Sequence, residues 1–465
     1  MEFIRSGSRV NLETGRLSVA FKTALLVFAG FVAFFTTNSV SAAEDNAIDP
    51  GHTAFMIACC GLVLLMTPGL ALFYGGMVRS KNILATMMHS MFAMGIITIC
   101  WVVVGYSIAF GDDKMGGLFG DPMTYFMFND VGWDETPPAG GNYPHIVFAA
   151  FQMMFAVITP ALITGAFAER VKFRAYAVFI ALWSLLIYSP ICHWVWGGGL
   201  LAPGSEESPT WLSSVAGVGA LDFAGGIVVH ISSGVAALVF VLMTGKRRGY
   251  PGNAMPPNNL VLTMLGAGML WFGWFGFNGG SQMAADGQAG LAMVTTHLAA
   301  ATGAVTWAVI ERMHRGKVSA LGVASGLIAG LACITPAAGF VSPGSAMIIG
   351  IMGGALCYFA VVVVKSSLGY DDSLDVFGVH GVSGTVGALL TGCFVIESLS
   401  WTGIAAGGQQ IWAQVIAVVV TWVFAGVGTA ILIKLVDATI GIRVSENDEQ
   451  EGLDITQHGE VGYNI

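Results

Sequence analysis

LDFAGGIVVHISSGVAAL, the stretch from Leu221 to Leu238, places Asp222 and His230 inside an otherwise apolar segment. An ionisable side chain inside a membrane is costly, so it faces a partner or a polar path rather than lipid. A second stretch, LDVFGVHGVSGTVGALL from Leu374 to Leu390, begins with the same Leu-Asp and carries the same H-x-x-S-G pattern at His380. Two membrane histidines in matching places predict an internal repeat with a site shared between its halves.

The composition of the whole chain indicates an all-α polytopic membrane protein. Of 465 residues, 55% are hydrophobic and 10% charged, and the mean hydropathy is +0.74. The net charge of −9 gives no indication of nucleic-acid binding. Repeated apolar runs are long enough to cross a bilayer as helices. We expect eleven of them, near 53–78, 83–110, 144–168, 174–196, 219–244, 259–279, 289–312, 319–336, 344–365, 374–395 and 409–440.

The first 42 residues differ from the rest. Four basic residues precede a short apolar run, Ala24 to Phe35, and the small-residue sequence SVSAAED follows from Ser39. This order is typical of a signal peptide. We expect residues 1–42 to be removed by cleavage near Ala42 or Ala43; an uncleaved first helix is the alternative.

The distribution of basic residues predicts the orientation. Fifteen Lys and Arg residues follow the signal, and all but Lys114 fall on alternate connections or at the span ends beside them. By the positive-inside rule, the mature N-terminus lies outside and the C-terminus inside. Termini on opposite sides of the membrane require an odd number of spans.

Eleven spans divide into five, five and one. The expected units are repeat A at about 53–244, repeat B at about 259–395 and a last long helix at about 409–440. A repeated five-span unit reverses its orientation, which gives an inverted repeat. FYGG at 73–76 and FNGG at 277–280 also match weakly. This symmetry would bring His230 and His380 together near the middle of the bilayer.

The last segment, 441–465, is polar and acidic, and we expect it to be a cytoplasmic tail following the membrane domain of 43–440. Such a segment buries too little apolar surface to fold alone. It is either a disordered end or a docking segment, and the residues alone leave both open.

Several aromatic residues and one serine are candidates for a cation site. The predicted topology places Trp196 at the outer end of the fourth span, and Trp274, Phe277 and Ser281 toward the outer end of the sixth. Phe155 lies partway down the third span. An aromatic ring face attracts a compact cation, and a serine hydroxyl accepts a hydrogen bond from a cation that carries N–H groups. The alternative for such residues is an aromatic belt at the membrane interface.

The acidic and histidine positions suggest different roles. Asp222 lies eight residues before His230, about 12 Å along a helix, so we do not expect it to pair with that histidine directly. Its carboxylate can lower the cost of a cation at the mouth and can also cap the helix start, and we favour a mixed role. Asp375, five residues before His380, is expected to be structural. A lone membrane histidine usually serves packing, but two at equivalent positions can share one proton. An apolar pore with a neutral pair disfavours K⁺, which cannot shed a proton.

Longer motifs identify a family resemblance. They are PGLALFYGGMVRSKN from Pro68, ALITGAFAERVKF from Ala161, SPICHWVWGGGLL from Ser189, LDFAGGIVVHI from Leu221, WFGFNGGS from Trp274 and DVFGVHGV from Asp375. With these motifs the chain resembles the Amt/Mep/Rh ammonium transporters, in particular their bacterial Amt branch. The resemblance implies a homotrimer in the bacterial inner membrane, with one pore per protomer. It also implies docking of a PII signalling protein at the tail segment EGLDITQHGE.

The resemblance also implies roles for individual residues. Phe155, Trp196 and Ser281 correspond to the external recognition site, and Asp222 to the aspartate beneath it. Phe155 and Phe277 correspond to a stacked phenyl gate. We assign His230, His380 and Trp274 to the pore. The loop 202–220 is longer than the family's usual link, and we assign it no function.

We expect a transporter that recruits NH₄⁺, deprotonates it and conducts NH₃ past the two histidines, with the proton possibly following separately. The alternative is an ammonium sensor of the same fold, which would normally need a signalling domain larger than 25 tail residues. A metalloenzyme is disfavoured because the sequence has no H-E-x-x-H and no cysteine cluster. We therefore expect no metal, no cofactor and no catalytic residue. A water or glycerol channel would have no reason for an aromatic cation site.

Overall fold

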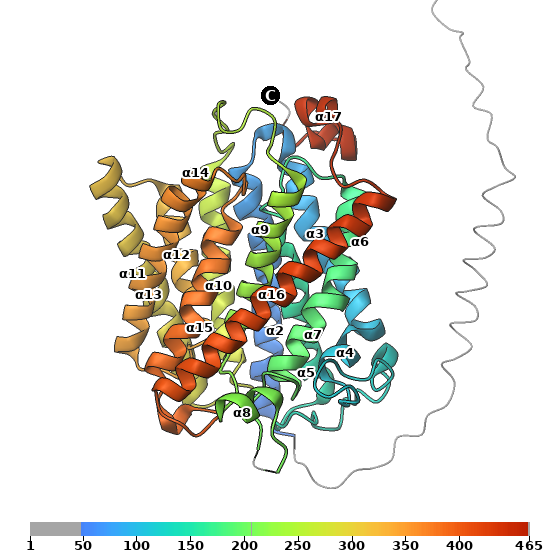
Figure 1. Cartoon of the computed structure of the whole chain (residues 1–465), viewed down its shortest axis with the longest axis vertical. Coiled ribbons are helices and arrows are strands. Elements are labelled where there is room, and N and C mark those ends of the chain that lie inside the picture. The colour runs from blue at the N-terminus through green and yellow to red at the C-terminus, as the bar shows by residue number, and fades with distance from the viewer. Residues whose placement is uncertain (1–47, 206, 464–465) are drawn as a thin grey trace, which may run out of the picture. The chain divides into compact units, whose positions relative to one another are not determined.

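The computed structural model describes residues 48–205 and 207–463, and the expected signal peptide lies outside this range. Helices make up most of the described chain (Figure 1). Because lipid offers no hydrogen-bond partners, an apolar segment that crosses a membrane must satisfy its backbone groups within a helix. Ten described helical segments are long and apolar enough to span, and the fifteen-residue helix Ala320–Ile334 is an eleventh, shorter one.

The helices have the following bounds: α2 Pro50–Met77, α3 Ile83–Cys100, α4 Tyr106–Phe110, α5 His145–Ile163, α6 Phe173–Trp183, α7 Ser189–Trp196, α8 Trp211–Ala216, α9 Ser232–Thr244, α10 Leu260–Gly280, α11 Gly287–Arg315, α12 Ala320–Ile334, α13 Pro343–Phe359, α14 Lys365–Leu368, α15 Val382–Phe394, α16 Gly408–Thr439 and α17 Glu446–Glu451. The predicted all-helical membrane architecture is confirmed. Most predicted span ends lie within a few residues of the observed ones; the fifth span, expected to start at 219, becomes helical at Gly226.

Several spans contain a π-helical turn, which the sequence did not predict. These turns are η3 Trp101–Gly105, η5 Ser184–Tyr188, η6 Gly226–Ile231, η7 Ala360–Val364 and η8 Phe377–Gly381. Turns of this kind often occur at functional sites because they re-aim side chains within a helix. His230 lies in η6 and His380 in η8. The two histidine-bearing spans therefore share the same local distortion.

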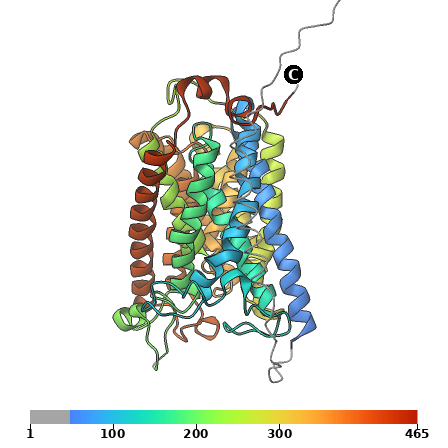
Figure 2. The same ribbon diagram turned by 90° about the vertical axis from the view of Figure 1, so that its right-hand side faces the viewer.

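Close helix packing relies on small residues. Helix α10 runs along α2 (Figure 2), and Gly266 lies so near that an added Cβ would come within 2.5 Å of the Phe73 nitrogen and the Gly69 oxygen. Small residues let membrane helices approach closely. The long helix α16 crosses the bundle obliquely (Figure 1) and packs on α6, α9 and α15.

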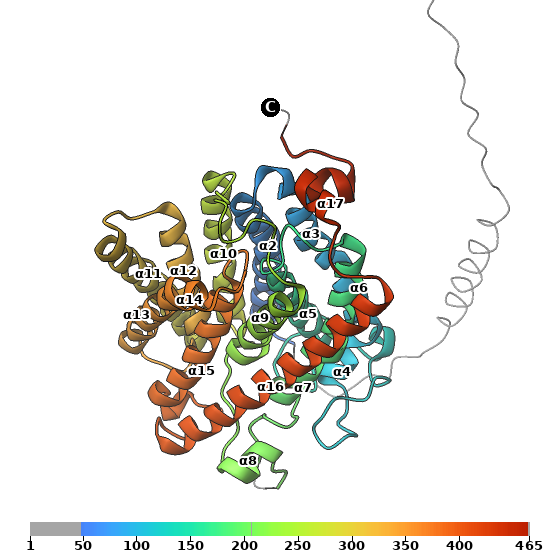
Figure 3. The ribbon, with the colours of Figure 1, turned by 45° about the horizontal axis from the view of Figure 1, so that its top comes forward.

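The segment after α16 is ordered and lies on one end of the bundle, where Figure 3 shows α17. The Leu453 amide donates to Asn82 Oδ1 at 2.8 Å, and the Ala85 amide donates to Asp454 Oδ1 at 2.8 Å. The tail carboxylate thus caps the first turn of α3, where helix N–H groups lack intrahelical partners. Farther on, the Tyr463 hydroxyl donates to Asn258 Oδ1 at 2.7 Å. These contacts explain how a segment too polar to fold alone becomes ordered.

A buried charge cluster lies beneath the tail. Arg247 donates from Nη2 to Asp371 Oδ1 at 2.8 Å and from Nη1 to Glu169 Oε2 at 3.1 Å. Arg170 Nη1 lies 3.3 Å from Asp371 Oδ2, and Arg79 Nε donates to Glu169 Oε2 at 2.9 Å. Burial alone would raise the pKa of Asp371, but the hydrogen bonds and charges of Arg247 and Arg170 outweigh it and hold the pKa below its usual range.

Candidate functional site: an aromatic vestibule above a buried histidine pair

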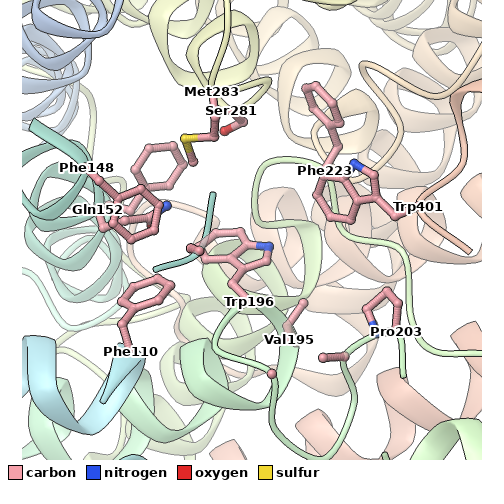
Figure 4. A pocket seen from close by; sticks show the side chains of 14 residues that line it. Phe110, Phe148, Gln152, Val195, Trp196, Pro203, Phe223, Ser281, Met283 and Trp401 are labelled. Carbon is pink, nitrogen blue, oxygen red and sulfur yellow. The ribbon is translucent and has the colours of Figure 1, made fainter. Parts of the chain in front are cut away.

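A cavity of about 400 Å³ opens at the end of the bundle opposite the tail. We call it the vestibule (Figure 4). Its lining includes three sequence-predicted residues, Phe155 on α5, Trp196 at the end of α7 and Ser281 just after α10. Gln152 and Trp401 also line it, and the sequence analysis missed both. A polar glutamine between apolar neighbours on a membrane span was a signal that could have revealed the first of them.

The polar groups of the vestibule are oriented by hydrogen bonds. Trp196 Nε1 donates to the backbone oxygen of Asp222 at 2.8 Å, which fixes the plane of the indole ring. Ser281 Oγ donates its proton to the backbone oxygen of Phe277 at 2.8 Å. Because the hydroxyl proton is already donated to this carbonyl, the serine oxygen can only accept a further hydrogen bond. The vestibule therefore offers ring faces and an acceptor, both suited to a small cation that donates hydrogen bonds.

Two phenyl rings separate the vestibule from the interior. Phe155 and Phe277 have ring centroids 4.2 Å apart and an interplanar angle of 30°. Phe155 lines the vestibule, while Phe277 lines a second, narrower cavity beyond it. Both side chains are buried. The two rings therefore lie where the linings of the two cavities meet.

The second cavity contains the histidine pair. His230 Nδ1 and His380 Nδ1 are 3.2 Å apart, and their rings are stacked at a centroid distance of 5.2 Å. The cavity has about 10 Å³ of space, room for about one water molecule. Trp274 stacks on His230 at 5.5 Å, and its Nε1 donates to Thr335 Oγ1 at 3.0 Å. Apolar side chains form the rest of the wall: Met66, Leu70, Phe73, Ile158, Leu162, Val229, Phe277, Leu270 and Ile328.

The glycines of the two H-x-x-S-G motifs explain why the histidines meet. A Cβ on Gly234 would lie 2.2 Å from the Gly381 nitrogen, and one on Gly384 would lie 2.9 Å from His230 Cβ. Each motif glycine therefore packs against the other motif's histidine-bearing turn. The crossing is possible only because neither position has a side chain. The repeated motif is thus the geometric device that brings the two rings into hydrogen-bond range.

Asp222 caps the helical turn that carries His230. Its carboxylate is fully buried and accepts the four amides of residues 225–228 at 2.5–3.1 Å. Helix N-termini present unpaired N–H groups and favour negative charge. The capping role considered for Asp222 is therefore the one that the geometry displays, and the aspartate reaches Trp196 through its backbone oxygen.

The matching Leu-Asp at 374–375 is misleading. Asp375 has a φ of +62° and pairs with Lys365 Nζ at 2.6 Å, partly exposed. The cap of η8 is instead Asp372, whose Oδ2 accepts the Phe377 amide at 2.8 Å and which is fully buried. Asp372 precedes His380 by eight residues, the same spacing as Asp222 to His230. The counterpart of Asp222 in the second histidine-bearing segment is therefore Asp372, and the sequence already contained this spacing.

Sequence similarity to known proteins agrees with the geometry of the two cavities. The model of the Ammonium Transporter Family matches residues 54–463. The chain belongs to this family. It is 47% identical over 423 residues to an ammonium transporter of Bacillus subtilis (strain 168), covering 89% of this chain and 98% of that protein. An ammonium transporter of Aquifex aeolicus (strain VF5) is 43% identical, with 94% and 99% covered.

Solved structures of the family have the same fold. Saccharomyces cerevisiae Mep2 superposes with a TM-score of 0.78 at 34% identity, over 87% of this chain and 90% of that one. A structure described as "Sensor Amt Protein" gives a TM-score of 0.79 at 30% identity, over 90% and 100%. Family membership makes this chain an ammonium transporter rather than an enzyme, and the buried His230–His380 pair is consistent with a two-histidine pore.

Proposed function

We propose that the protein recruits NH₄⁺ in the vestibule, removes a proton near Phe155 and Phe277, and passes NH₃ along His230 and His380. The released proton either follows through the histidine pair or returns to water on the vestibule side. The observation that carries this proposal is the order of the two cavities. A polar, aromatic vestibule suits a cation, whereas the narrow apolar cavity beyond it suits a neutral molecule. Transfer of a charge into such surroundings costs several kcal/mol. Ammonium avoids this cost by giving up its proton and entering as neutral NH₃, whereas K⁺ can only enter as an ion.

The site assignments belong to the same proposal. Phe155, Trp196 and Ser281 hold the cation, with Asp222 beneath them stabilising the turn and adding negative charge near the mouth. Phe155 and Phe277 form the gate, and Trp274 orients His230 by stacking on it. The support is the shared vestibule lining and the ring distances given above.

Ser281→Ala tests the recognition site. Removing the acceptor is expected to raise the ammonium concentration that gives half-maximal transport by about tenfold, because a hydrogen bond to a charged group contributes about 1.5–3 kcal/mol. Ammonium-driven uptake by purified protein in liposomes measures this. Ser214→Ala is the matched control, since its hydroxyl bonds to Thr210 on an exposed loop helix away from the pore. An unchanged half-saturating concentration in Ser281→Ala would remove the serine from the recognition site.

We further propose an inverted repeat, residues 53–244 and 259–395, with the N-terminus outside and the tail in the cytoplasm of a bacterial inner membrane. Support comes from the equal spacing of Asp222–His230 and Asp372–His380 and from the two crossing glycines. The basic residues gather at the tail end, as the orientation requires. The cleaved signal peptide at 1–42 and the homotrimer belong to this proposal on the family resemblance.

A regulatory role of the tail, residues 441–465, is also part of the proposal. The described tail contacts the connection before α3, the start of α6 and the connection before α10. A PII signalling protein that binds this surface would therefore act on several spans at once. An ammonium sensor remains the second candidate, favoured by the similarity to the solved Sensor Amt Protein; transport at substantial rates would separate the two.

A further inference from the structure

Gln152 is a polar side chain of the vestibule that the roles above do not use. It lies on α5, three residues before Phe155, and is 4% exposed. Its side chain lines the vestibule, and Figure 4 shows its amide nitrogen at the cavity. Its Oε1 atom is buried and has no hydrogen-bond partner among the described residues. Buried polar atoms in folded proteins are mostly paired; several described residues carry an unpaired one, and Gln152 is the only one of these that lines the vestibule.

An unpaired buried carbonyl oxygen reduces stability, since it has lost its water without gaining a protein partner. A methionine would fill the same space, unbranched and of similar length, without that cost. Polar groups retained at such a cost are often groups that a ligand completes. The missing partner of Gln152 Oε1 is a hydrogen-bond donor. If the amide turns about its last torsion, Oε1 takes the place of the amide nitrogen at the vestibule, from which that donor can arrive.

The remaining vestibule groups indicate which donor fits. NH₄⁺ has four N–H groups arranged tetrahedrally. Ser281 Oγ can accept a hydrogen bond from one of them. Trp196 and Phe155 contribute aromatic rings, which attract the cation but offer no lone-pair acceptor for a directed hydrogen bond. A second oxygen acceptor is therefore lacking from the predicted set. The terminal torsion of a glutamine is broad and roughly two-fold, so its amide can turn the oxygen into the cavity at little cost.

We propose that Gln152 is a second acceptor for ammonium in the vestibule and that it favours ammonium over methylammonium. This inference rests on the proposed recognition site and deepens it. Methylammonium has three N–H groups and one methyl group, so it can satisfy Ser281 and yet leave Gln152 facing a methyl. Ammonium can meet both oxygens in every orientation. Gln152 would thus act on the selectivity of recruitment rather than on passage through the histidine pair.

Gln152→Met is the test, because it keeps the shape and removes the acceptor. In liposome uptake, the half-saturating ammonium concentration is expected to rise about tenfold, as for loss of one hydrogen bond to a charged group. The corresponding value for methylammonium should rise less, so the preference for ammonium falls. Maximal transport should change little. Gln152→Glu, which keeps the oxygens, should bind ammonium at least as tightly as the wild type.

Thermal unfolding of the purified variants separates binding from structure. If Gln152 is retained for its ligand, Gln152→Met melts no lower than the wild type in ammonium-free buffer, and ammonium stabilises it less. A lower melting temperature, with an unaltered preference between the two substrates, would overturn the inference and make Gln152 a packing residue. If Ser281→Ala shifts ammonium recruitment and Gln152→Met does not, only this inference fails. If neither variant shifts it, the proposed recognition site fails as well.

Discussion

His230→Asp is expected to admit K⁺ to a pore from which, on the proposed mechanism, the wild-type protein excludes it. The substitution places a carboxylate in a narrow apolar cavity, where it offsets part of the cost of a bare cation. The cation then has no need to lose a proton. The ratio of ammonium current to K⁺ current should fall by about tenfold or more, which corresponds to about 1.4 kcal/mol of lost discrimination. His380→Glu should act in the same direction, because the two rings share one hydrogen bond.

Ser233→Ala is the matched control for these variants. Ser233 lies three residues after His230, but its hydroxyl donates to the Val229 oxygen of its own helix at 2.6 Å. It should leave selectivity unchanged. Currents from protein reconstituted on a solid-supported membrane, with ammonium and K⁺ jumps applied in turn, measure the ratio. A His230→Asp protein that still excludes K⁺ would show that selectivity lies elsewhere, in the vestibule or the phenyl rings.

Asp371→Asn is expected to cause the largest loss of stability. Asp371 is fully buried and accepts hydrogen bonds from the backbone amide, Nε and Nη2 of Arg247, at 2.7–2.9 Å by the shortest contacts. It also faces Arg170, which is fully buried. Removing one partner from a buried ion pair costs about 3–5 kcal/mol, because the remaining charges stay buried without compensation. Thermal unfolding of detergent-purified protein, followed by loss of the monodisperse species, measures the effect.

Asp121→Asn provides the contrast, since Asp121 pairs with Lys114 on an exposed loop. Such surface pairs contribute little to stability, and no measurable change in melting temperature is expected.

The lowered pKa of Asp371 also makes the stability of the protein depend on pH. Its contribution is complete above the ordinary carboxyl pKa of 3.8 and is lost as the pH falls through the lower folded-state pKa. If Asp371→Asn and the wild type have the same melting temperature at neutral pH, the buried ion pairs of Asp371 with Arg247 and Arg170 do not contribute to stability.

Much of the fold could be predicted because lipid imposes strong constraints. A span must be long, apolar and helical, so hydropathy locates it to within a few residues. The local geometry was harder. No sequence pattern distinguishes the π-helical turns around His230 and His380 from ordinary helix, and the close crossing at Gly234 and Gly384 is seen only in the folded chain. The docking of the tail likewise depends on acceptors and donors from three distant connections.

The candidate site shows the same division. The histidine pair was predictable because two ionisable residues at repeated positions are rare in a membrane. The counterpart of Asp222 was missed, since the repeated Leu-Asp dipeptide draws attention to Asp375 while the spacing to the histidine is kept by Asp372. Gln152 was missed because a single amide within an apolar span has no motif. Its significance depends on a cavity formed by α5, α7 and the end of α10, which only the folded chain brings together.

The most direct test of the proposed mechanism is a pair of readings from one liposome preparation of wild-type protein. Ammonium and K⁺ jumps are applied while a solid-supported membrane records current and an internal dye records pH. We predict ammonium-driven transport with no K⁺ response. A transient current would mean that the proton follows the ammonia, while internal alkalinisation without current would mean that ammonia crosses alone. A K⁺ current equal to that of ammonium would contradict the account, because a pore that passes K⁺ does not select by removing a proton.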